Sequence, residues 1–100
     1  MMLTATRIKA EDAHRLGLVN EVVPLADLMP AAERWASEIL ECAPLSVRAS
    51  KQMALQGLDS PLDIAFARSY SQQRLQVASA DRVEGPRAFS EKRKPNWTAK

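Results

Sequence analysis

The sequence has 100 residues, of which 46% are hydrophobic and 26% charged, and its net charge is +2. This length allows one domain at most, and the composition is typical of an ordered globular chain, which argues against disorder. No apolar run approaches the roughly 18–20 residues that span a bilayer, the amino-terminal stretch lacks the apolar segment of a secretory signal, and the single cysteine, Cys42, cannot form an intrachain disulfide. We therefore expect a cytoplasmic protein without a membrane segment.

The first half of the chain predicts two helices separated by an extended run. Residues 10–16 predict a short helix that stops at Gly17, because glycine is usual just past a helix end. The run 19–23, rich in β-branched residues, is the only strand-like segment, either an edge strand or merely extended chain. Apolar residues at the i, i+3, i+4, i+7 positions over 27–41 predict an amphipathic helix.

The middle of the chain predicts two further helices. Pro44 opens a helix over about 45–58, which ends in a run of turn-forming residues. A long helix is then expected from Ser60 or Pro61 through about Val77, with its apolar residues clustered on one face.

The last helix is predicted to begin late because of a proline. Pro86 deep inside a helix would remove a hydrogen bond and cost about 3 kcal/mol. We therefore expect a turn over 79–83 and a regular helix from near Glu84 to Arg93. Asp81 and Glu84, three residues apart, resemble a capping box. The expected fold class is mainly α, with four to five helices and at most one short strand.

Residue patterns that support catalysis are missing from the sequence. His14 stands among charged residues on a short helix, as a surface histidine does, and Cys42 has the context of a small buried residue at a helix end. One histidine and one cysteine form no metal-ligand set, and three glycines build no phosphate-binding loop. We expect no catalytic residue, no metal and no cofactor in this chain.

Positive charge is concentrated at the carboxyl end. Residues 81–100 hold six basic and three acidic side chains, and half of the basic ones form the run Lys92–Lys94. Such a tail favours an anionic partner, whether phosphate groups, nucleic acid or an acidic protein surface; the alternative is a solvated helix end. Lys51 shares a helical stripe with Val47 and Leu55, so it is either a lysine whose stem packs on apolar surface or a phosphate or inter-subunit contact.

Three motifs follow one another along the chain. The closing motif contains Ser79, Asp81, Glu84, Gly85, Ala88, Phe89, Glu91, Lys92, Arg93, Pro95 and Trp97. Lys9–Pro24 and Cys42–Lys51 carry the other two. In order and spacing, the three resemble the closing segments of the enoyl-CoA hydratase/isomerase (crotonase) family. The chain departs from the family pattern at Ala5, where glycine is usual, and at Gln73 and Val77, where bulky apolar or aromatic residues are frequent.

The resemblance implies a fold and a role for each of two segments of the chain. Residues 1–24 would be a remnant of the last turn of the crotonase spiral core, and 25–100 the carboxyl-terminal helical region that mediates trimer packing and covers the CoA site. The oxyanion hole and the catalytic carboxylates would lie before Met1. The resemblance thus implies a carboxyl-terminal fragment, inactive alone, of an enzyme that acts on acyl-CoA thioesters, with hydration of 2-enoyl-CoA as the expected reaction. The alternative is a stand-alone helical self-assembly module.

The resemblance also implies roles for single residues. Lys92 matches the family lysine that approaches a CoA phosphate, and Phe89 lies one helical turn before it, next to the acyl or adenine region or, alternatively, in the core. Arg93, Lys94 and Lys51 are further candidates for a phosphate or interface contact. Acyl-CoA would be a substrate and not a cofactor, and the expected partner is the chain itself, as a trimer or dimer of trimers. A nucleic-acid partner is not expected, because aromatic residues are few and the net charge is small.

Overall fold

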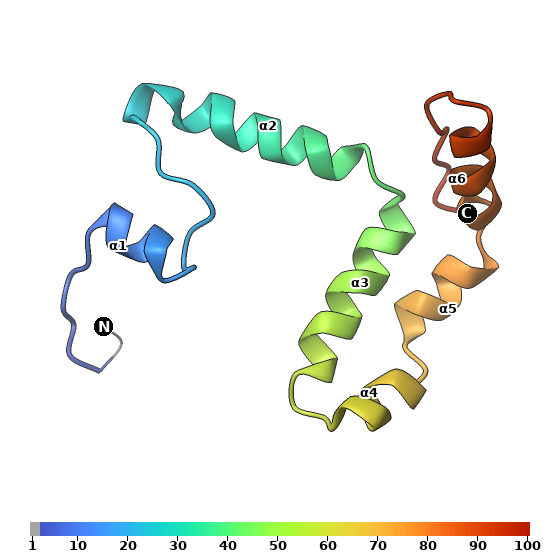
Figure 1. The fold of residues 1–100 in the computed structure, drawn as a ribbon, viewed down its shortest axis with the longest axis horizontal. Helices are drawn as coiled ribbons and strands as arrows, with labels where there is room; N and C mark the ends of the chain where they lie inside the picture. The colour runs from blue at the N-terminus through green and yellow to red at the C-terminus, as the bar shows by residue number, and fades with distance from the viewer. Residues whose placement is uncertain (1–2) are drawn as a thin grey trace. The chain divides into compact units, whose positions relative to one another are not determined.

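The computed structural model describes residues 3–100, so the first two residues of the predicted segment 1–24 lie outside the described part. Its elements are α1 (Ala10–Arg15), a 3₁₀ turn η1 (Leu25–Asp27), α2 (Leu28–Leu40), α3 (Pro44–Gly57), α4 (Leu62–Ala67), α5 (Ser71–Ala78) and α6 (Asp81–Ser90) (Figure 1). The mainly α class is confirmed. No strand occurs within residues 3–100, and the run 19–23 is a bend followed by chain without regular secondary structure.

The chain forms two compact units, Met1–Trp35 and Ala36–Lys100. The predicted boundary between residues 24 and 25 concerns the architecture of a larger protein and stays a prediction. No helix within residues 3–100 is both long enough and apolar enough to cross a membrane.

In the first unit, α1 ends as the sequence predicts. Gly17 adopts a φ of +73°, and the two amides at the helix end turn back to α1. The Gly17 N–H donates to the His14 carbonyl at 2.9 Å, and the Leu18 N–H donates to the Ala13 carbonyl at 2.9 Å. This pair of bonds is the Schellman motif, in which a left-handed residue satisfies the last free carbonyls of a helix.

One carboxylate ties the loop after α1 to the middle of α2. Glu21 accepts hydrogen bonds from the Trp35 indole at 2.9 Å and from the Arg34 guanidinium, which also lies 5.5 Å from the centre of the Trp35 ring. The bonds from Trp35 and then from Arg34 hold the pKa of Glu21 below its usual value. These contacts order the extended chain between the two helices.

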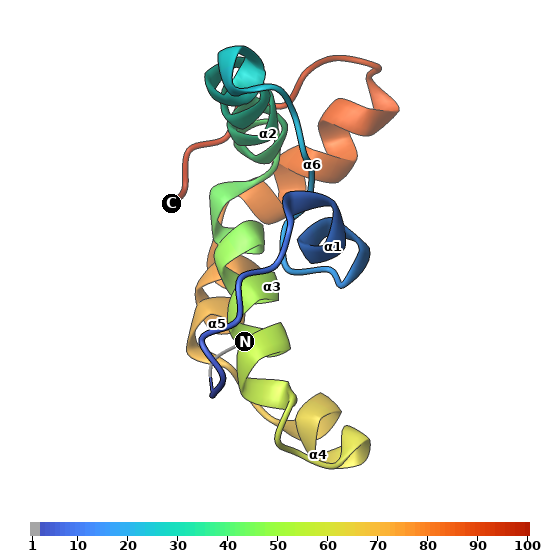
Figure 2. The same ribbon diagram turned by 90° about the vertical axis from the view of Figure 1, so that its left-hand side faces the viewer.

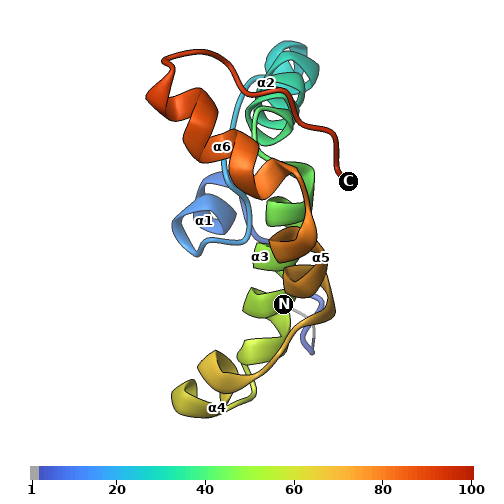
Figure 3. The same ribbon diagram turned by 90° about the vertical axis from the view of Figure 1, so that its right-hand side faces the viewer.

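In the second unit, α3 and α5 lie side by side, as Figures 2 and 3 also show. Leu45 and Ala49 of α3 are buried. Gln52 joins the two helices with both ends of its amide. Its Nε2 donates to the Ser71 hydroxyl at 3.0 Å, and its Oε1 accepts from the Gln72 N–H at 2.8 Å. Gln52 therefore satisfies a free amide in the first turn of α5, as a capping side chain does.

The expected long helix through Val77 is wrong, because the chain leaves helical geometry at Arg68 and resumes it at Ser71. Tyr70 supplies the reason. Its ring is buried, with 4% exposed, and its hydroxyl donates to the Ala65 carbonyl at 3.0 Å. In an unbroken helix that carbonyl would accept from the residue-69 amide. The Tyr70 hydroxyl replaces the lost partner while its ring fills the core. The break also raises the number of α-helices to six in residues 3–100, above the four to five expected.

The prediction for the last helix is also wrong at both ends. Helix α6 begins at Asp81 and ends at Ser90, with Pro86 inside it. No side chain caps its amino end, and the Asp81 carboxylate instead accepts hydrogen bonds from Thr98 and Ala99. The first turn is held by the returning carboxyl-terminal chain, which the sequence pattern around Asp81 and Glu84 does not reveal.

Candidate functional site

The carboxyl end of α6 repeats the Schellman motif, but with a lysine in the left-handed position. The Lys92 N–H donates to the Phe89 carbonyl at 3.2 Å, and the Arg93 N–H donates to the Ala88 carbonyl at 3.0 Å. Lys92 has a φ of +53°. A side chain with a Cβ pays about 1 kcal/mol for this conformation, which glycine adopts freely.

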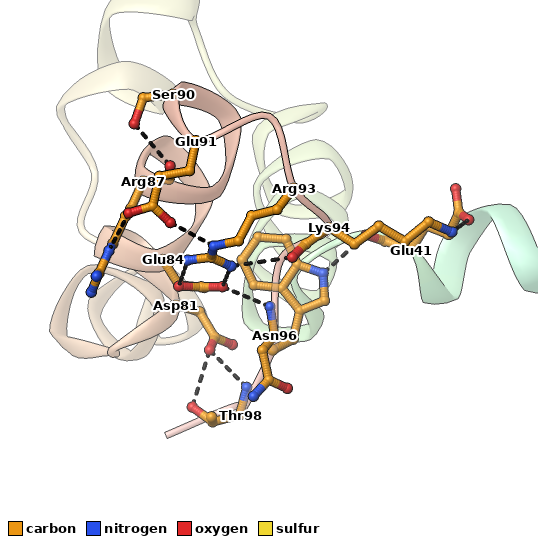
Figure 4. Close-up of polar contacts among 11 residues, drawn as sticks. Glu41, Asp81, Glu84, Arg87, Ser90, Glu91, Arg93, Lys94, Asn96 and Thr98 are labelled. Carbon is orange, nitrogen blue, oxygen red and sulfur yellow. Dashed lines mark hydrogen bonds and ion pairs between the residues drawn. The ribbon is translucent and has the colours of Figure 1, made fainter.

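An ion cluster surrounds this turn (Figure 4). The Arg93 guanidinium donates to both oxygens of Glu84, at 2.6 and 3.0 Å, and its Nε donates to Glu91 at 2.6 Å. The Asn96 N–H donates to Glu84 at 2.7 Å, and Arg87 donates to Glu91 at 2.9 Å. Paired, charge-assisted bonds of this kind fix both direction and distance.

The electrostatics of the cluster favour the charged forms of its members. The bonds from Arg93, followed by the one from the Asn96 amide, lower the pKa of Glu84 from 4.5 to about 2. The bonds from Arg87 and Arg93 lower the pKa of Glu91. The bonds to Glu84 and then Glu91 raise the pKa of Arg93. All three side chains therefore stay ionised at neutral pH.

The chain after the cluster folds back and forms hydrogen bonds with residues of the same unit. Thr98 donates to the Asp81 carboxylate from its N–H at 2.8 Å and its hydroxyl at 3.1 Å, and the bond from the Thr98 amide is the main reason that the pKa of Asp81 is lowered. The Trp97 indole donates to the Glu41 carbonyl at 2.9 Å. Its ring lies against Gly85, where a Cβ would come within 3.3 Å of it. Residues 80–100 thus form one hydrogen-bonded substructure.

The structure brings the two main predicted residues, Lys92 and Phe89, to the same end of α6. The Lys92 side chain is exposed, and its ammonium makes no hydrogen bond or ion pair with any residue from 3 to 100. Phe89 is 87% exposed, so it does not belong to the core of this chain. The site therefore presents one cation and one aromatic ring to the surroundings.

Two of the three secondary candidates, Arg93 and Lys94, differ from Lys92 in having carboxylate partners. Arg93 is occupied by two carboxylates. The Lys94 ammonium lies 3.4 Å from Glu41, with 93% of its side chain exposed. Lys51 is exposed on α3, a separate element, without an ion pair to the described residues. The phosphate or interface roles of these three residues stay predictions.

Sequence reasoning missed the Glu84–Arg93 pair. Nine residues of helix would separate them by roughly 13 Å, and the pair forms only because the chain reverses at Lys92. The signal that could have found it is the run of opposite charges at both ends of a short helix. The capping-box pattern instead pairs Glu84 with Asp81.

The remaining reactive side chains form no site within residues 3–100. His14 is exposed, as expected, with its Nδ1 3.3 Å from the Val19 carbonyl. The expectation that Cys42 is buried is wrong, since its thiol is exposed after the end of α2 and contacts the Glu38 carbonyl at 3.7 Å. No group of three His, Cys, Asp or Glu residues in the described part could hold a metal ion.

Comparison with known proteins connects this geometry to a family. The model of the family described as Enoyl-CoA hydratase/isomerase matches residues 1–100. The chain belongs to this family. It is 42% identical over 95 residues to the (E)-benzylidenesuccinyl-CoA hydratase of Thauera aromatica, covering 95% of this chain and 37% of that protein. It is 39% identical over 100 residues to the crotonyl-CoA hydratase of Syntrophomonas wolfei, covering all of this chain and 38% of that protein.

Solved structures show the same relationship. A protein described as a short chain enoyl-CoA hydratase from Novosphingobium aromaticivorans is 48% identical, with a TM-score of 0.90 over 98% of this chain and 39% of that one. The enoyl-CoA hydratase of Mycobacterium tuberculosis is 35% identical, with a TM-score of 0.85 over the same shares. The predicted fold, a helical part of the crotonase fold, is confirmed. The chain spans less than two fifths of the length of these relatives.

Proposed function

We propose that this crotonase-family chain supplies the coenzyme A-binding end of an enzyme that acts on acyl-CoA thioesters, with hydration of a 2-enoyl-CoA as the reaction. The observation that carries the proposal is the exposed Lys92 ammonium, held on a structured turn without a carboxylate partner in residues 3–100. An ammonium on a flexible stem binds phosphate as a compact point charge. Hydratases among the relatives support the reaction class.

Phe89 completes the proposed contact. Its ring is three residues before Lys92 and is largely exposed. Stacking of a base on an aromatic side chain contributes about 1–3 kcal/mol, so the ring can take the adenine or the adjoining acyl region while the lysine takes a phosphate. Acyl-CoA is then the substrate and not a resident cofactor.

We propose that the chain has no activity by itself. Hydration of a thioester needs donors that stabilise the enolate oxygen, together with carboxylates that move protons. The family resemblance assigns none of these groups to residues of this chain, and the site at α6 offers one cation and one ring. The reaction therefore depends on the part of the crotonase fold that this chain does not span.

A chimaera tests the proposal. The whole chain would replace the matching 38% of the Syntrophomonas wolfei crotonyl-CoA hydratase, to which it aligns over its full length. We expect the chimaera to hydrate crotonyl-CoA and residues 1–100 alone to be inactive. Lys92→Ala in the chimaera should raise the KM for crotonyl-CoA roughly tenfold, as loss of a charged hydrogen bond does. A folded chimaera without hydratase activity, or one indifferent to Lys92→Ala, would contradict the proposal.

Self-association is the second part of the proposal. Helices α3, α4 and α5 line an apolar groove of about 570 Å³, and large apolar side chains around it are exposed, among them Leu58, Leu62 and Phe66. Apolar patches of this kind mark contact surfaces. We propose that the working protein is a homo-oligomer, a trimer or a dimer of trimers, without a nucleic-acid partner. Sedimentation of the chimaera as a monomer at micromolar concentration would exclude this assembly. A cytoplasmic location stays a prediction.

A further inference from the structure

The turn after α6 places a strained residue between two fixed ones. Lys92 holds a φ of +53°, and a residue other than glycine keeps such a conformation only where its surroundings determine it. A fold that needed only a helix stop would be served by glycine, as at Gly17. Neighbouring residues must therefore hold Lys92 in this conformation.

The residues on either side of Lys92, Glu91 and Arg93, are both held by ion pairs. Arg93 is bound to both oxygens of Glu84 in the first turn of α6, and through its Nε to Glu91, the residue before Lys92. Glu84 and Arg93 are also partly shielded, with 19% and 38% of their side chains exposed. Only the planar fork of an arginine can make this set of parallel bonds.

The same contacts disfavour Arg93 as an anion ligand. Its three nitrogens donate to Glu84, Glu91 and the Lys94 carbonyl. A phosphate that approaches the guanidinium would have to displace two carboxylates, which are negatively charged like the phosphate itself. Arg93 and Lys92 are neighbours in sequence, but Arg93 binds carboxylates of this chain whereas the Lys92 ammonium is available to an anionic ligand.

We infer that the Glu84–Arg93 pair positions Lys92. The pair fixes the turn in which the Lys92 ammonium extends from the surface, and it takes Arg93 out of the anion-binding set. Arg93 is thus a positioning residue that acts through Lys92. This inference rests on the proposed coenzyme A-binding role of Lys92.

Kinetics of the chimaera with two substrates test the inference. Crotonyl-CoA carries the nucleotide phosphates, whereas crotonyl-pantetheine lacks the nucleotide. We expect Glu84→Gln and Arg93→Lys each to raise the KM for crotonyl-CoA several-fold, with kcat unchanged and with no change in the KM for crotonyl-pantetheine. A purely structural defect would affect both substrates alike. Arg87→Ala, which removes a second arginine from Glu91, is the matched control and should change neither KM.

The opposite assignment predicts a different pattern. If Arg93 itself binds phosphate, Glu84→Gln frees the guanidinium, so the KM for crotonyl-CoA stays the same or falls, and Arg93→Lys retains most of the affinity. Either result overturns the inference. Glu84→Gln exchanges one oxygen for an NH₂ group of the same shape, so it provides the test even if the Arg93 variant does not fold.

A double-mutant cycle separates this inference from the function on which it rests. In the Lys92→Ala background, Arg93→Lys should cause no further rise in KM, because the residue it positions is gone. Additive effects would show that Arg93 acts independently of Lys92. If Lys92→Ala alone leaves the KM for crotonyl-CoA unchanged, the proposed function fails. If Lys92→Ala raises the KM and Glu84→Gln does not, only the positioning inference fails.

Discussion

Helices α1 and α6 end in the same hydrogen-bonded motif with different residues in the left-handed position. Gly17 closes α1 at a φ of +73°, and Lys92 closes α6 at +53°. Glycine adopts this conformation without steric cost, whereas lysine does not. At Gly17 a Cβ would meet nothing within 4 Å, so the α1 end relies on backbone freedom alone. The α6 end relies on the ion cluster around Glu84, Glu91 and Arg93.

The difference shows two ways to stop a helix. A glycine end needs no neighbours and presents no side chain. A lysine end needs neighbours to hold it, and it presents a charge at a defined place. Residues kept in costly conformations cluster at functional sites, which is the pattern that the α6 end shows and the α1 end does not.

The largest stability effect is expected at the glycine end. Gly17→Val forces a β-branched residue into the left-handed region and should destabilise the end of α1 by about 2 kcal/mol. Faster hydrogen exchange of the Leu18 amide, which bonds to Ala13, would report it. Gly17→Asn is the control, since asparagine tolerates this region. Equal exchange rates in the two variants would contradict the assigned conformation.

The reverse change is expected to stabilise the lysine end. Lys92→Gly should raise the free energy of unfolding by about 1 kcal/mol, because glycine removes the conformational cost at +53°. Lys92→Ala keeps a Cβ and should have little effect, so the pair of variants isolates the backbone contribution. Thermal unfolding followed by circular dichroism measures both. If the Lys92→Gly protein is no more stable than the Lys92→Ala protein, the left-handed conformation at residue 92 carries no cost for a residue with a Cβ, and the two helix ends do not differ in this respect.

Acid should weaken the α6 end and leave the α1 end unchanged. The pKa of Glu84 is lowered from 4.5 to about 2 in the folded chain by Arg93 and the Asn96 amide. A carboxyl group whose pKa is lowered by folding stabilises the folded state at every pH above its pKa in the unfolded chain. This contribution is lost as the pH falls from about 4.5 towards 2. The protection of the Arg93 amide against hydrogen exchange, relative to the rate of the unfolded chain at the same pH, should fall across this range, and Glu84→Gln should flatten the dependence.

The smallest effect is expected for Arg87. Its pair with Glu91 is an exposed i, i+4 contact, with 67% and 42% of the two side chains accessible. Such pairs contribute little to stability. Arg87→Ala should leave the unfolding temperature unchanged within error, whereas Arg93→Ala should lower it measurably. Similar shifts of the unfolding temperature in both variants would mean that Arg93 contributes no more to stability than Arg87 does.

Much of the helical layout is readable from neighbouring residues. The 3.6-residue apolar period predicts α2, and Pro44 marks the start of α3. Gly17 marks the end of α1. These signals depend on contacts within one or two turns of helix, so they are present in the sequence itself. The closing motif predicts the family, which the comparisons confirm.

The predictions that failed depend on contacts over longer stretches of chain. Tyr70 breaks a periodic helix because its ring is buried and its hydroxyl reaches Ala65. Asp81 finds its partners at Thr98 and Ala99, and not in its own helix. Spacing rules cover only short separations, so they assign such residues to the nearest plausible partner.

The sequence by itself determined the helical class, the position of most helix ends, the family and the choice of Lys92 and Phe89 as candidate ligands. Only the tertiary structure decided that Lys92 lies in a left-handed turn and that Arg93 is bound by carboxylates. The physical reason is chain reversal. It brings Glu84 and Arg93 together from positions that a continuous helix would hold far apart, and in doing so it separates the roles of two adjacent basic residues.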